Sequence, residues 1–292
     1  MLIRYGYEIT VNSWDPTAMV TMLTVRDGRE ADIRVPEAFS TDPQIETSTY
    51  KDLFGNTCRR FIAPPGDLTL RSDSVIEVSG ETDPVGLDAE QHPVADLPDD
   101  CLIYLMGSRY CETDRLSQLA WNTFGQTPPG WLRVQAICDF AHERIAFNYQ
   151  NARSTRTAFE AYEEQTGVCR DFAHLAVALC RCMNIPARYV NGFLGDIGVP
   201  TLDPMDFSAW IEVYLGGRWW TFDPRNNIPR IGRIVIAHGR DAADVAMITS
   251  FGSHLLNRFT VWVDEVDSVS MVTAAEGESR QSGRERNGQT PL

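Results

Sequence analysis

The sequence predicts an α+β protein in which an amino-terminal β domain precedes a second domain of helices packed on an antiparallel sheet. Three observations support this prediction. Apolar and polar residues alternate in the first part of the chain, as they do in half-buried strands. After residue 100 the apolar period lengthens to that of helices, and after residue 186 it returns to that of strands.

The strand signals of the first domain lie in residues 1–82. From Ile3 to Val11, isoleucine, tyrosine and valine occupy alternate positions, so one face of this strand is predicted to be buried. Turn-forming residues separate further short apolar runs at 19–25, 33–35 and 74–79. We therefore predict a small all-β domain in this part of the chain.

A linker and then helices are predicted after the β domain. Residues 83–100 contain repeated proline, aspartate and glycine without a period of either kind, as linkers do. Apolar residues then recur at helical spacing over 116–124 and 134–145. A third helical segment is predicted over 170–183, and it ends there because Pro186 disfavours helix in the residue before it.

The predicted strands of the second domain are residues 187–193, 207–215, 218–222, 233–237 and 255–263. Gly216-Gly217 separates two of them and has the composition of a two-residue hairpin loop. We assign residues 101–273 to this domain. Residues 274–292 contain almost no large apolar side chain, and we predict a disordered tail there.

Charge and hydropathy exclude several classes of partner. The net charge of -14 is spread along the chain and has the wrong sign for phosphate binding, so nucleic acid is not expected as a partner. No apolar run approaches the roughly 20 residues that cross a bilayer. The first residues lack the basic and apolar regions of a signal peptide. We expect a cytoplasmic protein that has no membrane partner.

The seven cysteines form an odd set without CxxC pairs or metal-finger spacing. This pattern predicts free thiols, with no disulfide framework and no metal site, and we expect no cofactor. Cys169 stands out among them because it follows Gly167 and begins the helical pattern CRDFAHLAVALC. Backbone N–H groups at a helix start favour a thiolate and can hold an oxyanion, so we expect a pKa below about 8.5. The alternative is a buried cysteine that only begins the helix.

The predicted hairpin places a second candidate site. With a two-residue loop Leu215 faces Arg218 and Trp210 faces Asp223, so Ser208 lies one diagonal step from Asp223. Diagonal neighbours are about 7 to 8 Å apart, which a histidine at position 208 would span and a serine does not. We expect Ser208, Trp210 and Asp223 to share the sheet face directed toward the helix of Cys169.

These segments resemble the transglutaminase-like superfamily. The resemblance covers GVCRDFAHLAVALCRCMNIPARYVNGF and SAWIEVYLGGRWWTFDP and, more loosely, the amino-terminal β domain. It implies a papain-like fold with a cysteine nucleophile, a histidine base and an orienting aspartate, at the positions of Cys169, Ser208 and Asp223. It also implies an acyl transferase or an amide or peptide hydrolase that forms a thioester on Cys169 with a peptide or protein substrate.

The middle position departs from the family pattern. Ser208 has no useful basicity near neutral pH and cannot take a proton from a thiol. Some relatives carry a histidine shortly after the aspartate, but here that stretch reads Asp223-Pro224-Arg225-Asn226-Asn227. The alternative function is therefore a degenerate, non-catalytic peptide-binding module.

Three other residues bear on the missing base. His238 follows the strand RIVIA and is the best substitute base in the sequence. His174 lies five helix positions after Cys169, which turns it about 140° away, so we expect a hydrogen-bonded packing residue. Arg225 falls opposite Ser208 in the predicted register and would stabilise a thiolate there, the alternative being a solvated loop residue.

Overall fold

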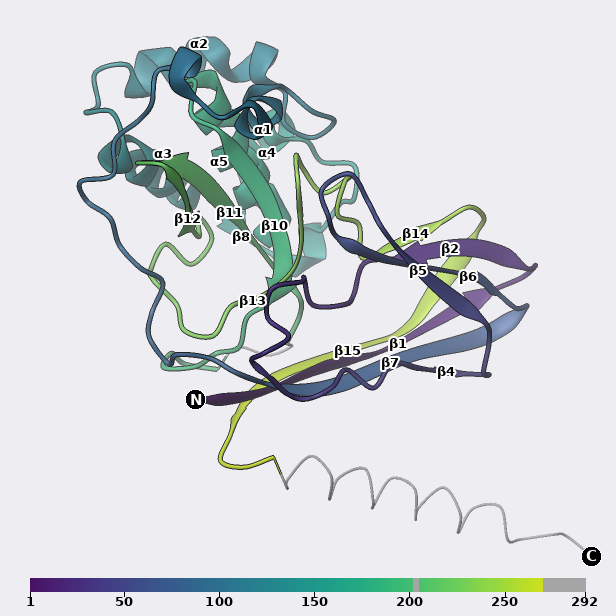
Figure 1. The fold of residues 1–292 in the computed structure, drawn as a ribbon. Helices are drawn as coiled ribbons and strands as arrows, with labels where there is room; N and C mark the ends of the chain where they lie inside the picture. Colours follow the sequence, from purple (N-terminus) through teal and green to yellow (C-terminus); the bar gives the residue numbers. More distant parts are fainter. Residues whose placement is uncertain (202–204, 270–292) are drawn as a thin grey trace, which may run out of the picture.

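The fold is that of a computed structural model, which describes residues 1–201 and 205–269. Its elements confirm the α+β class. A lobe of helices packed on a four-stranded sheet lies beside two further sheets (Figure 1). The predicted tail, residues 274–292, lies outside the described residues, and the division of the chain into two domains stays a prediction.

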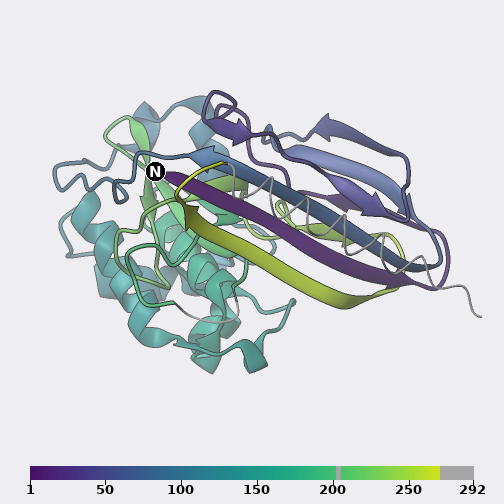
Figure 2. The same ribbon diagram turned by 90° about the horizontal axis from the view of Figure 1, so that it is seen from below.

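The first sheet is built around a long central strand, β1 (Leu2–Ser13), which pairs antiparallel on both sides. Its neighbours are β15 (His254–Val266) and β7 (Gly66–Glu77), and β7 also pairs with the short strands β3 (Ile33–Val35) and β4 (Ser40–Asp42). Figure 2 shows β1, β7 and β15 running side by side. The last described strand therefore adds to the sheet that the first strand begins, whereas residues 255–263 were predicted to belong to the second domain.

A second sheet covers this region with the order β14-β2-β6-β5. Its strands are β14 (Ile248–Ser250), β2 (Thr17–Thr21), β6 (Thr57–Ala63) and β5 (Thr47–Lys51).

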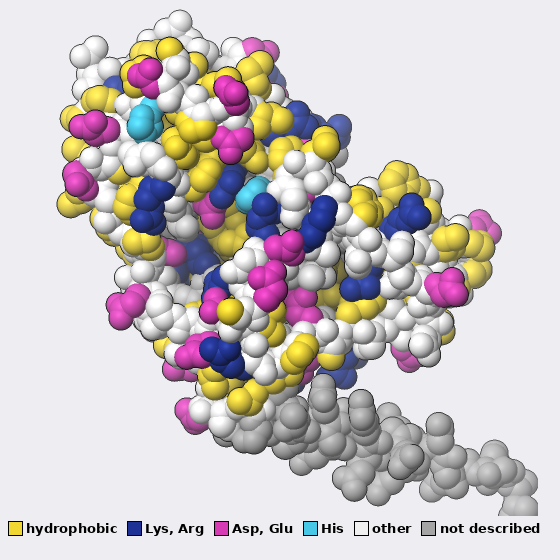
Figure 3. Space-filling model, in the orientation of Figure 1, with side chains coloured by type: hydrophobic (Ala, Val, Ile, Leu, Met, Phe, Trp, Pro, Cys, Tyr) yellow, Lys and Arg dark blue, Asp and Glu magenta, His cyan; other side chains and the backbone are white. Residues whose placement is uncertain are grey.

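Acidic and basic side chains are interspersed over the face of the molecule that Figure 3 shows. This distribution agrees with a net charge that is spread along the chain.

Five α-helices are described: α1 (Asp99–Leu102), α2 (Thr113–Phe124), α3 (Trp131–Arg144), α4 (Ala158–Glu164) and α5 (Cys169–Cys182). Helices α2, α3 and α5 confirm the three predicted segments, because their apolar stripes pack inward. Helix α4 was not predicted from the sequence; Thr157 and Glu160 begin it with a capping box. In the described residues, no helix is long and apolar enough to cross a membrane.

The helical lobe contains an antiparallel sheet of order β12-β11-β10-β13. Its strands are β12 (Arg218–Phe222), β11 (Ser208–Leu215), β10 (Ala187–Phe193) and β13 (Ile234–Gly239). Leu215 pairs with Arg218 as predicted. The loop residues Gly216 and Gly217 have φ angles of 57° and 83°, as the two central residues of a type I′ turn require.

Candidate active site

Cys169 is the first residue of α5, directly after the two-residue strand β9 (Thr166–Gly167). The helix start is held by the buried carboxylate of Asp171, which accepts the Val168 N–H at 2.9 Å and pairs with Arg156 at 3.1 Å. Only glycine fits at position 167, since a Cβ there would lie 2.6 Å from the Asp171 side chain. All seven cysteines are free thiols, and Cys169 is half-buried whereas the other six are buried.

The environment of Cys169 favours the thiol over the thiolate. Burial, and to a smaller extent the carboxyl group of Asp206, raise the pKa of Cys169 to about 11. The Arg225 guanidinium and the backbone N–H groups of Ala209 and Arg170 act in the opposite direction, but they do not outweigh burial. The predicted pKa below about 8.5 is therefore wrong.

One face of β11 lies against the helices. Ile211 pairs with Tyr189 of β10, whose ring centroid lies 5.0 Å from that of His174 on α5. Ile211 also pairs with Phe222 of β12, and the ring centroid of Phe222 lies 4.4 Å from that of Trp131 on α3. Since side chains alternate along a strand, the even-numbered residues of β11 lie on the opposite face of the sheet.

Ser208, Trp210 and Asp223 belong to that opposite face. The Arg233 guanidinium lies 4.9 Å from the centroid of the Trp210 ring and donates to the Asp223 carboxylate at 2.8 Å, so it joins two of the three residues. The predicted hairpin register is confirmed. The prediction that this face is directed toward α5 is wrong, because α5 covers the alternate residues of β11.

Asp223 is buried and fully engaged by its own loop. Its carboxylate accepts from Nη2 of Arg233 and from Nδ2 of Asn226, both at 2.8 Å. It also accepts the backbone N–H groups of Arg225 at 3.1 Å and Asn226 at 2.9 Å. Burial alone would raise the pKa of Asp223, but Arg233 and Asn226 together lower it below its usual value. Its oxygens are thus occupied by residues other than the one at position 208.

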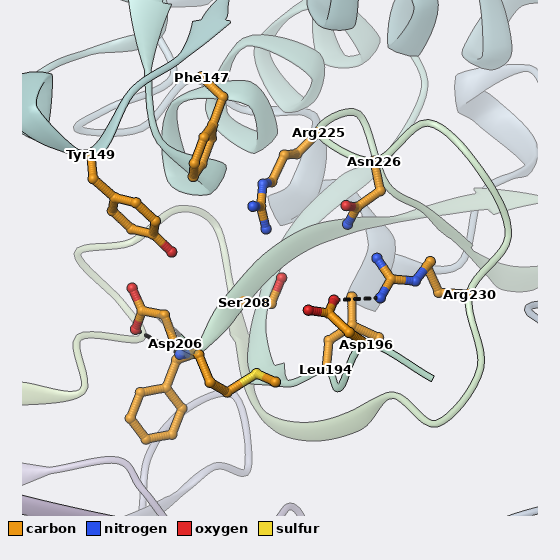
Figure 4. A pocket seen from close by; sticks show the side chains of 11 residues that line it. Phe147, Tyr149, Leu194, Asp196, Asp206, Ser208, Arg225, Asn226 and Arg230 are labelled. Atoms are coloured by element: carbon orange, nitrogen blue, oxygen red, sulfur yellow. Dashed lines mark hydrogen bonds and ion pairs between the residues drawn. The ribbon is translucent and has the colours of Figure 1, made fainter. Parts of the chain in front are cut away.

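A pocket of about 220 Å³ opens beside Ser208 (Figure 4). The Ser208 hydroxyl is buried and has no hydrogen-bond partner among the described residues. Besides Ser208, the pocket is lined by apolar and polar side chains, and the polar ones include Tyr149, Asp206, Arg225 and Asn226. The pocket is therefore lined by groups of both charges around an unsatisfied hydroxyl.

Arg225 is a pocket residue rather than a solvated loop residue. Its guanidinium lies 4.1 Å from the ring centroid of Phe147, which comes from the strand β8 (Ala146–Phe147). His142 of α3 holds the loop, because its Nδ1 donates to the Arg225 carbonyl at 2.8 Å. The guanidinium extends toward Ser208 in the pocket (Figure 4). The sequence prediction of a guanidinium opposite Ser208 is consistent with this placement.

The two histidines singled out in the sequence lie elsewhere. His238 is buried on β13, where burial and the charges of Arg188 and Arg26 lower its pKa to about 3. His174 packs between aromatic rings, and its Nε2 accepts the Ala242 N–H at 3.1 Å, so its predicted packing role is confirmed. No histidine lines the pocket in the described part of the chain.

Asp206 and Tyr149, which also line the pocket, were not predicted from the sequence (Figure 4). Asp206 lies in the loop before β11, and Tyr149 begins the short 3-10 helix Tyr149–Asn151. Burial raises the pKa of Asp206, whereas the Phe207 N–H, Arg225 and Tyr149 lower it by a smaller amount. Neither residue stands in a periodic segment or a motif, so no local signal marks it. Within residues 1–201 and 205–269, no group of three His, Cys, Asp or Glu side chains is arranged to hold a metal ion.

Comparison with known proteins agrees with this geometry. Residues 118–224 match the transglutaminase-like superfamily. An uncharacterized protein of Mycobacterium tuberculosis is 30% identical over 237 residues, which are 72% of this chain and 74% of that protein. An uncharacterized protein of Mycobacterium leprae is 27% identical over 216 residues, which are 70% of this chain and 76% of that protein. The crystal structure of a "Putative Cysteine Protease" from Cytophaga hutchinsonii is 31% identical, with 92% of this chain and 91% of that chain covered and a TM-score of 0.83. The chain therefore belongs to the transglutaminase-like superfamily.

Proposed function

We propose that the pocket beside Ser208 binds a segment of a peptide or protein without cleaving or transferring it. The observation that carries this proposal is that no imidazole lines the pocket in the described residues, while Asp223 is engaged by Arg233 and Asn226. Because the pKa of Cys169 is about 11, only ~1 thiol in 10,000 is ionised at pH 7. Thioester chemistry on Cys169 then lacks an imidazole that accepts the thiol proton.

Asp206 supports a second candidate, an acyl transferase or hydrolase with a carboxylate base. Asp206 acts electrostatically on Cys169, and its raised pKa makes it a stronger base than an ordinary aspartate. In this mechanism Asp206 takes the thiol proton as the sulfur attacks a carbonyl carbon, and then gives it to the leaving amine. The N–H groups of Ala209 and Arg170 would hold the oxyanion.

Turnover assays separate the two candidates. The wild type, Cys169→Ala and Asp206→Asn are compared with a glutamine-containing peptide, with and without an added primary amine, and with a peptide thioester. We expect wild-type turnover equal to that of Cys169→Ala, together with retained peptide binding. Wild-type turnover that both substitutions abolish would instead establish the enzyme with Asp206 as its base.

A gain-of-function variant tests whether the missing imidazole is what prevents turnover. Asn226 lines the pocket and donates to Asp223, so Asn226→His places an imidazole where the same carboxylate can orient it. We expect acyl transfer to rise by about a hundred- to ten-thousandfold. The gain should disappear in Asn226→His combined with Cys169→Ala. Ser208→His should gain less, because Arg233 and Asn226 already occupy the Asp223 carboxylate.

A cytoplasmic location is part of this proposal. All seven cysteines are free thiols, which reducing compartments maintain. The proposed partner is a peptide or protein rather than nucleic acid, since the net charge is -14. Fractionation of the cells that produce the protein tests the location, and recovery in an extracytoplasmic fraction would contradict it.

A further inference from the structure

The Arg225 guanidinium forms no direct ion pair with a carboxylate of the described residues. It is half-buried against the Phe147 ring at 4.1 Å, and no described carboxylate lies within ion-pair distance of it. The neighbouring arginines differ in this respect, since Arg233 pairs with Asp83 and Asp223. Asp206 acts on Arg225 through its charge but forms no ion pair with it, so a ligand can supply the direct counter-ion that this partly desolvated guanidinium lacks.

Ser208 adds a second unsatisfied group to the same wall. The residue is only 5% exposed, and its hydroxyl has no hydrogen-bond partner among the described residues. Figure 4 shows this hydroxyl and the Arg225 guanidinium directed into one space. A buried hydroxyl that lacks a partner costs about 1 to 3 kcal/mol, so it too favours a ligand that accepts a hydrogen bond.

We propose that the pocket recognises a carboxylate of its ligand, which accepts hydrogen bonds from the Arg225 guanidinium and the Ser208 hydroxyl. This inference rests on the proposed binding function and specifies the chemistry of the ligand. The planar guanidinium matches the two oxygens of a carboxylate, and such charge-assisted bonds are the strong ones. A volume of about 220 Å³ admits one side chain or one chain terminus. The carboxylate is therefore that of a Glu or Asp side chain or of a peptide carboxyl terminus.

The acidic residues of the pocket set the charge that the ligand meets. Asp196 is paired with Arg230 at 3.1 Å. Asp206 accepts the Phe207 N–H at 2.6 Å. Because its carboxylate also lines the pocket, its negative charge would repel a bound carboxylate. Removal of that charge by Asp206→Asn should therefore strengthen binding of an acidic ligand.

Four short probes test the inference by isothermal titration calorimetry on the full-length protein. Acetyl-Ala-Ala-Ala with a free carboxyl terminus is compared with its amide, and acetyl-Ala-Glu-Ala-amide with acetyl-Ala-Gln-Ala-amide. We expect at least one acidic probe to bind about tenfold or more tightly than its neutral partner. The pair that shows the difference identifies the source of the carboxylate. Equal binding within both pairs, or no binding of any probe at millimolar concentration, would overturn the inference.

Matched variants show which pocket residues cause the preference for acidic probes. Arg225→Gln should weaken the acidic probe about 10- to 150-fold and leave the neutral probe unchanged. Arg218→Gln is the control, because Arg218 lies over the Trp220 ring at 4.0 Å but outside the pocket. Ser208→Ala should weaken the acidic probe severalfold, and Asp206→Asn should strengthen it. An Arg225→Gln effect no larger than that of Arg218→Gln contradicts the proposal.

Turnover does not decide this inference. If the wild type proves to be an enzyme, the proposed function fails, but the carboxylate site still predicts a lower KM for acidic than for neutral substrates. That preference should be lost in Arg225→Gln. If turnover is absent and acidic and neutral probes bind equally, the carboxylate site fails while the binding function stands. Thermal unfolding of each variant shows whether a loss reflects the site or the fold.

Discussion

At Cys169, burial and a helix start act on one thiol in opposite directions. A helix terminus contributes about 0.3 to 1 kcal/mol, whereas a rise of the thiol pKa from 9.0 to about 11 corresponds to roughly 3 kcal/mol. Desolvation is therefore the larger effect. Cys169 is the nucleophile that the family resemblance predicts, but burial favours its protonated form.

Alkylation of Cys169 measures this balance directly. Native iodoacetamide labelling, followed by mass spectrometry, should give an apparent pKa near 11, because only the thiolate reacts. The charge of Asp206 raises the pKa of Cys169, so Asp206→Asn should lower this pKa. The charge of Arg225 lowers the pKa of Cys169, so Arg225→Gln should raise it. Arg218→Gln serves as the control. An apparent pKa at or below that of a free thiol would show that the helix start dominates.

At the scale of elements, helix α3 positions the loop that carries Arg225. Asn227 has a left-handed φ of 53°, and its side chain bonds Asp139 at 2.8 Å and Gln135 at 3.0 Å, both on α3. His142 of the same helix bonds the Arg225 carbonyl. Three positions of one helix thus hold the loop between β12 and β13 against the pocket.

Substitution of Asn227 tests this arrangement. Asn227→Gly keeps the left-handed backbone but loses both side-chain bonds, so the free energy of unfolding should fall by about 1 to 2 kcal/mol. Asn227→Ala should cost about 1 kcal/mol more, because alanine disfavours a positive φ. Asn122→Ala, an exposed position on α2, is the control in the same urea titrations. Equal stability of the glycine and alanine variants would argue against backbone strain at this position.

At the scale of the whole molecule, the two ends of the described chain form one sheet. Strand β1 lies between β7 and β15, and Gly6 faces Trp262 across the β1–β15 pair. A Cβ on Gly6 would lie 2.3 Å from the Ser72 carbonyl oxygen and 2.6 Å from the Trp262 ring. The close approach of three strands therefore depends on glycine at this position.

Gly6→Ala should destabilise the whole protein. Overpacking in a core costs typically about 1 to 3 kcal/mol, and here one of the two clashing groups is backbone that cannot change rotamer. Urea unfolding followed by tryptophan fluorescence gives the change in free energy. Thr49→Ala on the edge strand β5 should change it by less than about 1 kcal/mol. A loss for Gly6→Ala no larger than this control would refute the tight pairing of the chain ends.

Local pattern in the sequence was enough to predict much of the fold. The helix that begins at Cys169, strands β10 to β12 and the Gly216-Gly217 hairpin all follow from apolar periodicity and turn composition. The same segments contain the motifs of the transglutaminase-like superfamily. The resemblance to the family also predicts that Ser208 stands where the family has histidine, and this prediction rests on residue identity alone.

Only the tertiary structure decided how these residues act. The pKa of Cys169 depends on burial and on Asp206, and Asp223 pairs with Arg233, which precedes β13. Arg225 stacks on Phe147, a residue almost eighty positions earlier in the chain. The face of β11 that α5 covers, and the return of β15 to β1, also required coordinates. The physical reason is that desolvation and charge pairing arise from contacts between residues far apart in the chain, and the apolar period of a local segment contains no information on those contacts.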